Sequence, residues 1–210
     1  MIQTLALVRW ENPETYYIAG VAFLAAYFLG SIPFGLIFAW MAGAGDVRKR
    51  GSGNIGATNV LRTGNKIAAA ATLLFDMAKG FAAVLLAQIY LSFAPFVAIA
   101  ALGAFLGHLF PVWLGFKGGK GVATFIGIVF ALNLEVAFFT SASWIVVARA
   151  TRYSSLGGLA SAGLTPVYFA IFGETLWSAL TALIAVMIFV SHRANIARLI
   201  KGDEPGVGAR

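Results

Sequence analysis

The sequence predicts an all-α fold, a polytopic bundle of membrane-spanning helices, and three observations support this prediction. First, 60% of the 210 residues are hydrophobic and only 11% are charged, which is more apolar material than one soluble core of this size can bury. Second, eighteen Phe and five Trp are spread along the whole length. Third, the charged residues gather between the apolar segments. Residues 1–210 are therefore expected to form a single integral membrane domain.

The apolar segments give the expected spans in chain order. A helix that crosses the hydrocarbon core needs about 20 apolar residues. The candidate spans are 16–42, 67–91, 95–113, 122–133, 135–148, 156–172 and 175–190. The fourth and fifth are short and separated only by Leu134, so they form either one tight hairpin or one re-entrant pair. About seven transmembrane helices are expected, within a range of five to seven.

The segment before the first span contains Glu11, Pro13 and Glu14. It lacks the basic head followed by an apolar run that marks a secretory leader. We expect the first fifteen residues to be a short extramembrane tail.

The distribution of charge predicts the orientation. If the tail lies outside and the spans alternate, only Arg9 falls outside and only Lys79 within a span. The other basic residues fall on inner connections, and they are Arg48, Lys49, Arg50, Arg62, Lys66, Lys117, Lys120, Arg149, Arg152, Arg193, Arg198, Lys201 and Arg210. The positive-inside rule then places the N-terminus outside and the C-terminus in the cytoplasm. Orientation explains the net charge of +7, so no nucleic acid is expected as a partner.

The composition also limits the chemistry. The chain has no Cys and two His, which excludes disulfides, thiol nucleophiles and Cys-ligated metals and leaves too few ligands for a self-sufficient zinc site. No metal or other cofactor is expected.

The first inner loop, residues 45–66, is polar and rich in glycine: GDVRKRGSGNIGATNVLRTGNK. Gly51, Gly53 and Gly56 formally make a dinucleotide-binding pattern, but they follow a membrane helix instead of a strand, so that interpretation is rejected. Glycine backbone can still point several N–H groups at an anion. Polar groups that could join them are Ser52, Asn54, Thr58, Asn59 and Arg62. The alternative, a flexible basic loop facing anionic head groups, explains residues 48–50 better than it explains the two Asn.

The second inner segment, residues 107–124, reads GHLFPVWLGFKGGKGVAT. Glycines surround two lysines just before an apolar helix resumes, which is typical of a phosphate site. The candidate binding residues are Gly115, Lys117, Gly118, Gly119, Lys120 and Gly121. Gly121 stands where a Walker A loop requires Ser or Thr, so a nucleoside triphosphatase is unsupported. His108, at the inner end of the third span, is either an interfacial hydrogen-bonding residue or a catalytic one.

Two further clusters of polar residues are candidates. In the third inner segment, residues 192–204 (HRANIARLIKGDE), His192 and Asn195 share one helix face. An interfacial amphipathic helix accounts for most of this segment, but it does not require these two residues to be polar. Asp76 and Lys79 lie three apart within the second span and are expected to form a structural ion pair inside the bundle.

Five segments resemble the bacterial acyl-phosphate:glycerol-3-phosphate acyltransferases, the PlsY family. They are GSIPFG at 30–35, GSGNIGATNVLR at 51–62, DMAKG at 76–80, and the second and third inner segments. The resemblance implies a seven-helix enzyme of the bacterial inner membrane, surrounded by membrane lipid, with its active face in the cytoplasm. Such an enzyme transfers a fatty acyl group from acyl phosphate to the 1-hydroxyl of sn-glycerol 3-phosphate, forming lysophosphatidic acid for phospholipid synthesis. Functional coupling to an enzyme that forms acyl phosphate is expected.

The resemblance also implies roles for individual residues. It makes Ser52 and Arg62 functionally essential and assigns glycerol-phosphate binding to residues 115–121. The third motif supplies His192, Asn195 and Glu204, with a more structural role for Glu204. An acyl phosphate is a mixed anhydride with a good leaving group, so charge neutralisation and positioning suffice and no strong base is needed. We expect direct transfer between two bound phosphates, with a covalent acyl-Ser52 as the open alternative.

The basic and polar residues of the inner segments suggest where each of the two substrate phosphates binds. Lys117, Lys120 and the backbone N–H groups of the glycine loop are expected to hold one phosphate. Arg62, Ser52 and Asn54 would hold the other. His108, His192 and Asn195 would then orient the hydroxyl or a phosphate.

Two other functions are compatible with a polytopic membrane protein that has basic inner loops. A transporter of a phosphorylated metabolite or anion would show repeats, broken helices and ionisable groups at mid-membrane, whereas here only Asp76 and Lys79 lie deep. A synthase that joins a CDP-lipid to an alcohol would need an aspartate-rich metal motif, but the inner segments hold only Asp46 and Asp203.

Overall fold

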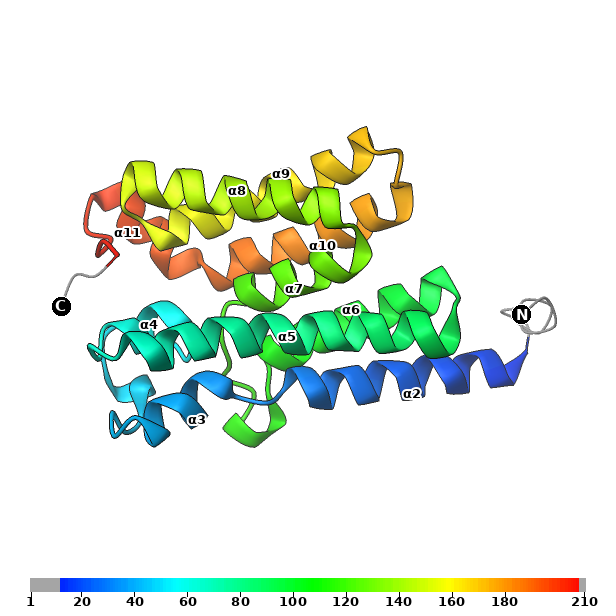
Figure 1. Ribbon diagram of the computed structural model, residues 1–210, viewed down its shortest axis with the longest axis horizontal. Helices are drawn as coiled ribbons and strands as arrows, with labels where there is room; N and C mark the ends of the chain where they lie inside the picture. The colour runs from blue at the N-terminus through cyan, green and yellow to red at the C-terminus, as the bar shows by residue number, and fades with distance from the viewer. Residues whose placement is uncertain (1–11, 208–210) are drawn as a thin grey trace.

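The computed structural model describes residues 12–207, in which every regular element is helical (Figure 1). The α-helices are α2 (Pro13–Gly30), α3 (Phe34–Met41), α4 (Ala57–Leu61), α5 (Lys66–Leu91), α6 (Ala94–Leu109), α7 (Val122–Leu132), α8 (Leu134–Thr151), α9 (Ser154–Ile171), α10 (Thr175–Ser191) and α11 (Arg193–Lys201). Two short 3-10 helices are η1 (Val47–Lys49) and η2 (Val112–Leu114). The predicted all-α class is confirmed. The predicted tail up to Glu11, with Arg9, lies outside the described residues, as does Arg210.

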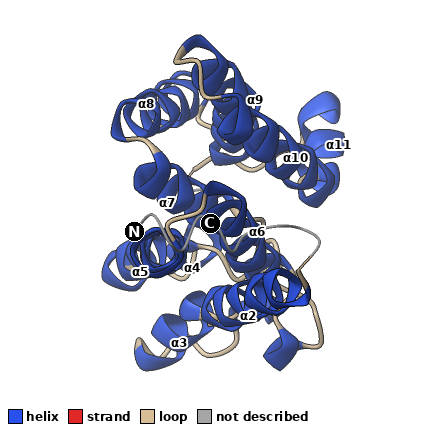
Figure 2. Ribbon diagram, turned by 90° about the vertical axis from the view of Figure 1, so that its right-hand side faces the viewer, coloured by secondary structure: helices blue, strands red, loops and turns tan. Residues whose placement is uncertain are grey.

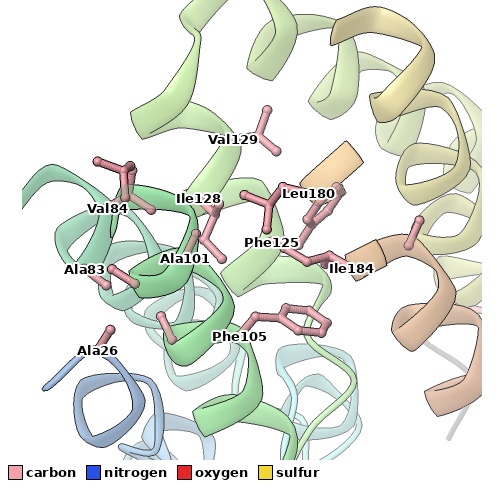
Figure 3. Packing of buried hydrophobic residues seen from close by; sticks show 14 of the residues in the cluster. Ala26, Ala83, Val84, Ala101, Phe105, Phe125, Ile128, Val129, Leu180 and Ile184 are labelled. Carbon is pink, nitrogen blue, oxygen red and sulfur yellow. The ribbon is translucent and has the colours of Figure 1, made fainter. Parts of the chain in front are cut away.

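Helix α7 is the centre of the bundle. It lies between α5 and α6 on one side and α8, α9 and α10 on the other (Figures 1 and 2). Its side chains Phe125, Ile128 and Val129 are fully buried. In Figure 3 Phe125 and Ile128 lie among buried side chains of α6 and α10, including Ala101 and Ile184. At 11 residues and a rise of about 1.5 Å per residue, α7 is shorter than the usual membrane-spanning helix.

The first predicted span, 16–42, corresponds to the apolar segment Pro13–Met41, but the structure breaks this segment into α2 and α3. Pro33 has no N–H group and disfavours a helical conformation of the residue before it. The break leaves the carbonyl of Ile32 without a partner in a helix, and Lys79 Nζ donates a hydrogen bond to it at 2.9 Å. The predicted ion pair of Asp76 and Lys79 is present at 2.7 Å. Lys79 thus pairs with Asp76 and also satisfies the carbonyl that the helix break leaves free.

Other predicted bounds shift for local reasons. Helix α6 ends at Leu109, four residues before the predicted end, because Pro111 follows and starts the turn that contains η2. Between α7 and α8, Asn133 breaks the helix with an extended backbone, and its side chain accepts the N–H of Val136 at 2.9 Å. Helices α7 and α8 pack against each other, which both a tight hairpin and a re-entrant pair require, so the two alternatives stay predictions.

Large apolar side chains cover the outside of the bundle. Tyr17, Phe138 and Ile171 are among the exposed ones, as expected of a surface that faces lipid. Among the described residues, 4 helical segments are long and apolar enough to cross a membrane, namely Pro13–Met41, Lys66–Leu91, Ala94–Leu114 and Leu134–Thr151. The bent pair α10 and α11 gives a fifth. The count of seven and the orientation stay predictions.

Candidate functional site

One cavity of about 340 Å³ opens at the end of the bundle that carries α4 and α11. Its polar lining comes from all three inner segments, and includes Ser52, Asn54, Thr58, Arg62, His108, Lys120, His192, Asn195 and Glu204. Its apolar lining comes from α5, α7 and α8, and includes Leu73, Met77, Ile126, Phe130, Trp144 and Ile145. The folding of the chain therefore joins a polar, cationic compartment to an apolar one within a single cavity.

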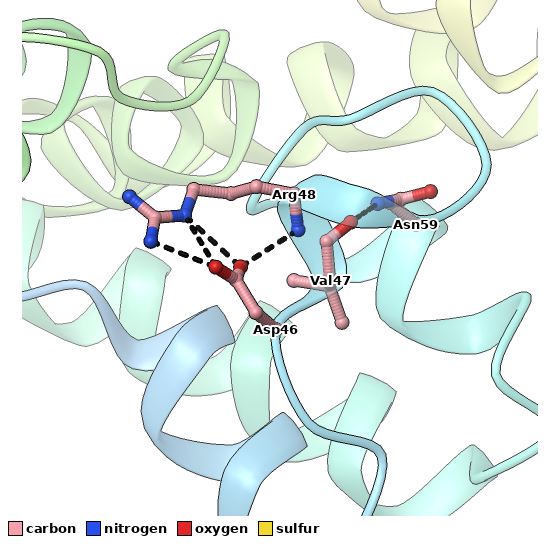
Figure 4. Close-up of polar contacts among 4 residues, drawn as sticks. All are labelled: Asp46, Val47, Arg48 and Asn59. Atoms are coloured by element: carbon pink, nitrogen blue, oxygen red, sulfur yellow. Dashed lines mark hydrogen bonds and ion pairs between the residues drawn. The ribbon is translucent and has the colours of Figure 1, made fainter.

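The side chain of Asn59, which is buried on α4, organises the first inner loop through hydrogen bonds to the loop backbone. Its Nδ2 donates to the carbonyls of Val47 at 2.8 Å, Arg50 at 3.1 Å and Asn54 at 2.7 Å, and its Oδ1 accepts the N–H of Ser52 at 3.1 Å. Figure 4 shows the bond to Val47. Both polar atoms of Asn59 are thus used within the loop. Asn59 holds Ser52 and its neighbours in place, and since it also lines the cavity, its role in substrate binding stays a prediction.

The glycines of this loop serve its backbone conformation. Gly51 has a φ of 53°, and a Cβ there would lie 2.4 Å from Asn59 Oδ1. Neither Gly51 nor Gly53 lines the cavity, although both were predicted to bind substrate. In the same loop Arg48 pairs with Asp46 at 2.8 Å (Figure 4). This pair offsets one of the three positive charges at residues 48–50.

The glycine-rich second segment differs most from its prediction. The N–H groups of Gly118 and Gly119 donate to the carbonyls of Leu109 at 3.0 Å and His108 at 3.1 Å. Those of Gly115 and Lys117 donate to carbonyls within the η2 turn. These donors are already used and the four residues lie outside the cavity lining, so the structure gives no support to a phosphate cradle of Gly115, Lys117, Gly118 and Gly119, which stays a prediction. Lys117 is exposed.

The cation that does reach the cavity from this segment is Lys120. It lies beside Gly121, the N-cap of α7, whose first-turn N–H groups have no carbonyl acceptor within the helix and favour an anion. The hydroxyl of Ser191 donates to the Lys120 carbonyl at 3.2 Å, which fixes the backbone. Burial lowers the pKa of Lys120 to about 8, against the opposing effect of Glu204, and the charges of Arg198 and Arg62 lower it further.

His192 is buried at the junction of α10 and α11. Its Nδ1 lies 2.9 Å from the carbonyl of Ile188, and a carbonyl can only accept, so Nδ1 carries the proton and Nε2 is an acceptor. Burial lowers the pKa of His192 to about 4, and nearby Lys120 adds to this effect. The imidazole is therefore neutral at pH 7, suited to accepting a hydrogen bond from a hydroxyl.

Glu204 connects three residues that line or adjoin the cavity on α9 and α11. It accepts hydrogen bonds from Ser155 at 2.7 Å, Asn195 at 2.6 Å and Arg198 at 2.7 Å. Although burial acts to raise its pKa, these donors hold the pKa of Glu204 below its usual value. The other amide atom of Asn195, Oδ1, is buried without a hydrogen-bond partner in the part of the chain that the structure describes. The bond to Glu204 thus fixes the orientation of the Asn195 amide, and its Oδ1 is available to accept a hydrogen bond.

Sequence reasoning missed several lining residues. Arg198 is predicted only as one of the basic residues of the inner connections, yet it reaches the cavity and Glu204. Pro205 and Val207 also line it, because the N–H of Val207 donates to the Arg152 carbonyl at 2.8 Å and folds the segment back. The Thr58 hydroxyl lies 3.0 Å from that of Ser154, which joins α4 to α9. No local sequence signal marks these contacts, since they depend on the packing of distant segments.

Asp76 and His108 line the cavity as well. Both are buried, and His108 Nδ1 lies 3.6 Å from Asp76 Oδ1. The ion pair predicted to be purely structural therefore reaches the site.

Comparison with known proteins identifies the family. Residues 20–202 match the sequence profile of the family described as glycerol-3-phosphate acyltransferase. The chain belongs to the glycerol-3-phosphate acyltransferase family. A glycerol-3-phosphate acyltransferase from Brucella suis is 55% identical over 190 residues, which cover 90% of this chain and 93% of the relative. One from Mesorhizobium japonicum is 53% identical over 191 residues, with 90% and 96% covered.

Solved structures agree with this acyltransferase assignment. The crystal structure of PlsY, described as an integral membrane glycerol 3-phosphate acyltransferase in its glycerol 3-phosphate form, superposes with a TM-score of 0.84 at 37% identity. It covers 90% of this chain and 94% of the solved chain. The lysophosphatidic acid form of PlsY gives a TM-score of 0.83 at 36% identity. This chain is thus a multi-pass membrane acyltransferase of phospholipid biosynthesis, and the transporter and CDP-lipid synthase alternatives are excluded.

Proposed function

We propose that this acyltransferase takes its acyl group from an acyl phosphate and passes it directly to the 1-hydroxyl of sn-glycerol 3-phosphate, giving lysophosphatidic acid. The observation that carries the proposal is the single cavity in which cationic and apolar linings are continuous. A fatty acyl phosphate has an anionic head and an apolar chain, so it matches both compartments at once. The bulky carrier of a thioester donor has no counterpart in a cavity of about 340 Å³.

The polar compartment offers two separate sets of anion-binding groups. Lys120 and the first turn of α7 would bind the phosphate of glycerol 3-phosphate, because a lysine and free backbone N–H groups converge there. Arg62, Ser52 and Asn54 line the part contributed by the first loop and would bind the acyl phosphate head. The apolar side chains of α5, α7 and α8 would take the acyl chain.

The proposed transfer needs positioning more than acid–base catalysis. The hydroxyl oxygen forms an ester bond with the acyl carbon, the bond from that carbon to the phosphate oxygen breaks, and inorganic phosphate leaves with the hydroxyl proton. His192 Nε2 and Asn195 Oδ1, the free acceptors of two oriented side chains, would orient the hydroxyl. A neutral His192 with a pKa of about 4 is a weak base, which fits a reaction in which the donor's own phosphate takes the proton.

A covalent acyl-Ser52 intermediate receives less support. A serine nucleophile is activated by a base within hydrogen-bond reach. Among the described residues, the Ser52 hydroxyl has no hydrogen bond to either histidine, and His192 Nδ1 is engaged by Ile188. We assign Ser52 to binding of the donor head.

The proposed setting is the bacterial inner membrane with the cavity mouth at the cytoplasmic face. The substrate glycerol 3-phosphate is a soluble cytosolic anion, whereas an acyl phosphate partitions into lipid. Functional coupling to an enzyme that forms acyl phosphate follows, since the mixed anhydride must be supplied continuously.

The test is acyl transfer to labelled glycerol 3-phosphate by the purified protein in detergent, with palmitoyl phosphate and palmitoyl-CoA as parallel donors. Labelled lysophosphatidic acid should form from palmitoyl phosphate alone. Ser52→Ala should lose most of the activity, whereas Ser92→Ala, at the far end of α5, serves as the matched control and should retain it. Equal or better transfer from palmitoyl-CoA would refute the proposed donor.

A further inference from the structure

Three buried ionisable residues, Asp76, Lys79 and His108, form a connected cluster within the bundle. Their exposed fractions are 2%, 3% and 4%. Lys79 Nζ lies 2.7 Å from Asp76 Oδ1, and His108 Nδ1 lies 3.6 Å from the same oxygen. Burying such charges is costly, and well-packed apolar residues would stabilise a bundle at least as well. The cluster therefore calls for a role beyond stability.

One end of the cluster is tied to the first membrane segment. Lys79 Nζ donates to the carbonyl of Ile32, between α2 and α3, at 2.9 Å. This carbonyl has left the helical pattern because of Pro33. The position of Lys79, and with it that of Asp76, is thus set by a break in the backbone.

The other end of the cluster holds the loop that leads to Lys120. The carbonyl of His108 accepts the N–H of Gly119 at 3.1 Å. The imidazole lies against the same residue, because a Cβ on Gly119 would come within 2.0 Å of His108 Nε2. Gly119 directly precedes Lys120. The His108 ring, between Asp76 and Gly119, therefore sets where the loop runs.

We infer that Asp76, Lys79 and His108 are positioning residues, which tie the break in the first membrane segment to the loop that presents Lys120 and the first turn of α7 to the substrate. This inference rests on the proposed function, in which Lys120 binds the phosphate of glycerol 3-phosphate. It also changes the expected role of His108 from catalysis to positioning, because its two ring nitrogens face Asp76 and Gly119. A displacement of about 1 Å at such a site can cost roughly a hundredfold in rate.

A double variant separates positioning from stability. Asp76→Asn leaves Lys79 as an uncompensated buried charge, so it should lower both the melting temperature and the affinity for glycerol 3-phosphate. Asp76→Asn combined with Lys79→Met removes both charges and should restore the melting temperature toward wild type. It should not restore the affinity: the Kd for glycerol 3-phosphate, measured by titration calorimetry, should stay about tenfold or more above wild type.

Two controls complete the experiment. Thr72→Val alters a buried residue one turn before Asp76 whose hydroxyl donates to the Ala68 carbonyl, and it should leave the Kd unchanged. Gly119→Ala acts from the loop side without touching the membrane-buried charges, and should raise the Kd even if the double variant fails to fold. Gly20→Ala, where a Cβ meets nothing within 4 Å, is its matched control.

The outcomes are distinct. The inference would be overturned if the Kd stayed within twofold of wild type in the double variant with restored melting temperature, or in Gly119→Ala. The ion pair would then be purely structural. If the wild type binds glycerol 3-phosphate but does not use palmitoyl phosphate, the proposed donor fails, whereas the comparison of Kd values still decides the role of the cluster.

Discussion

At the scale of single residues, Lys120 makes the site sensitive to alkaline pH. Its pKa of about 8 means that the free enzyme loses this charge as the pH rises past 8, and with it much of its attraction for a phosphate. We therefore expect kcat/KM for glycerol 3-phosphate to fall above about pH 8. In Lys120→Arg the guanidinium stays charged, so the alkaline fall should move to higher pH even if the maximal rate is lower. An unchanged alkaline limb in this variant would remove Lys120 from phosphate binding.

Asn59 shows how much one amide can organise. Replacement by Leu would leave the carbonyls of Val47, Arg50 and Asn54 without the donor that they share. An unsatisfied buried polar group costs about 1–3 kcal/mol, so the first loop should lose its conformation and become sensitive to protease, and transfer activity should fall at least about tenfold. Lys66→Ala, an exposed change at the start of α5, is the control. Full activity with an unchanged proteolysis pattern in Asn59→Leu would contradict the assigned role.

At the scale of elements, Glu204 joins α9, α11 and the segment after α11. Because its pKa is lowered in the folded protein, the carboxylate contributes stability above the pKa of the unfolded chain, about 4.3. That contribution is lost as the pH falls through the lower folded value. Glu204→Gln should therefore have a lower melting temperature than wild type at pH 7, and the difference should shrink at increasingly acid pH. A difference that is constant with pH would exclude the ionised carboxylate as its source.

The comparison of prediction with structure is also clearest for elements. Apolar runs located the membrane-length helices, because a helix that crosses lipid needs a long run of apolar residues, which is visible in the sequence. The break at Pro33 was missed, since the residues on both sides are equally apolar. In the glycine-rich segment, composition placed Lys117 and Lys120 together, but only the turn after Pro111 decides that Lys117 is exposed and Lys120 enters the cavity. Charge and motif type therefore predicted which segments meet, whereas backbone geometry selected the residues that face the cavity.

At the scale of the whole molecule, the absence of Cys from these 210 residues makes the orientation directly testable. Single substitutions Lys49→Cys and Glu174→Cys place one thiol on each predicted side of the membrane. In intact cells a membrane-impermeant maleimide should label Glu174→Cys alone, and in inverted vesicles Lys49→Cys alone. The reverse pattern would put the cavity mouth on the outer face and contradict a supply of glycerol 3-phosphate from the cytosol.

The whole account depends on two substrates meeting in one cavity without a covalent enzyme intermediate. The most direct measurement is the intact mass of the purified enzyme after incubation with palmitoyl phosphate alone, followed by addition of glycerol 3-phosphate. Direct transfer predicts an unmodified mass in the first step and lysophosphatidic acid only after the second substrate is added. A palmitoylated enzyme that maps to Ser52 and is discharged by glycerol 3-phosphate would contradict the account and establish the two-step route.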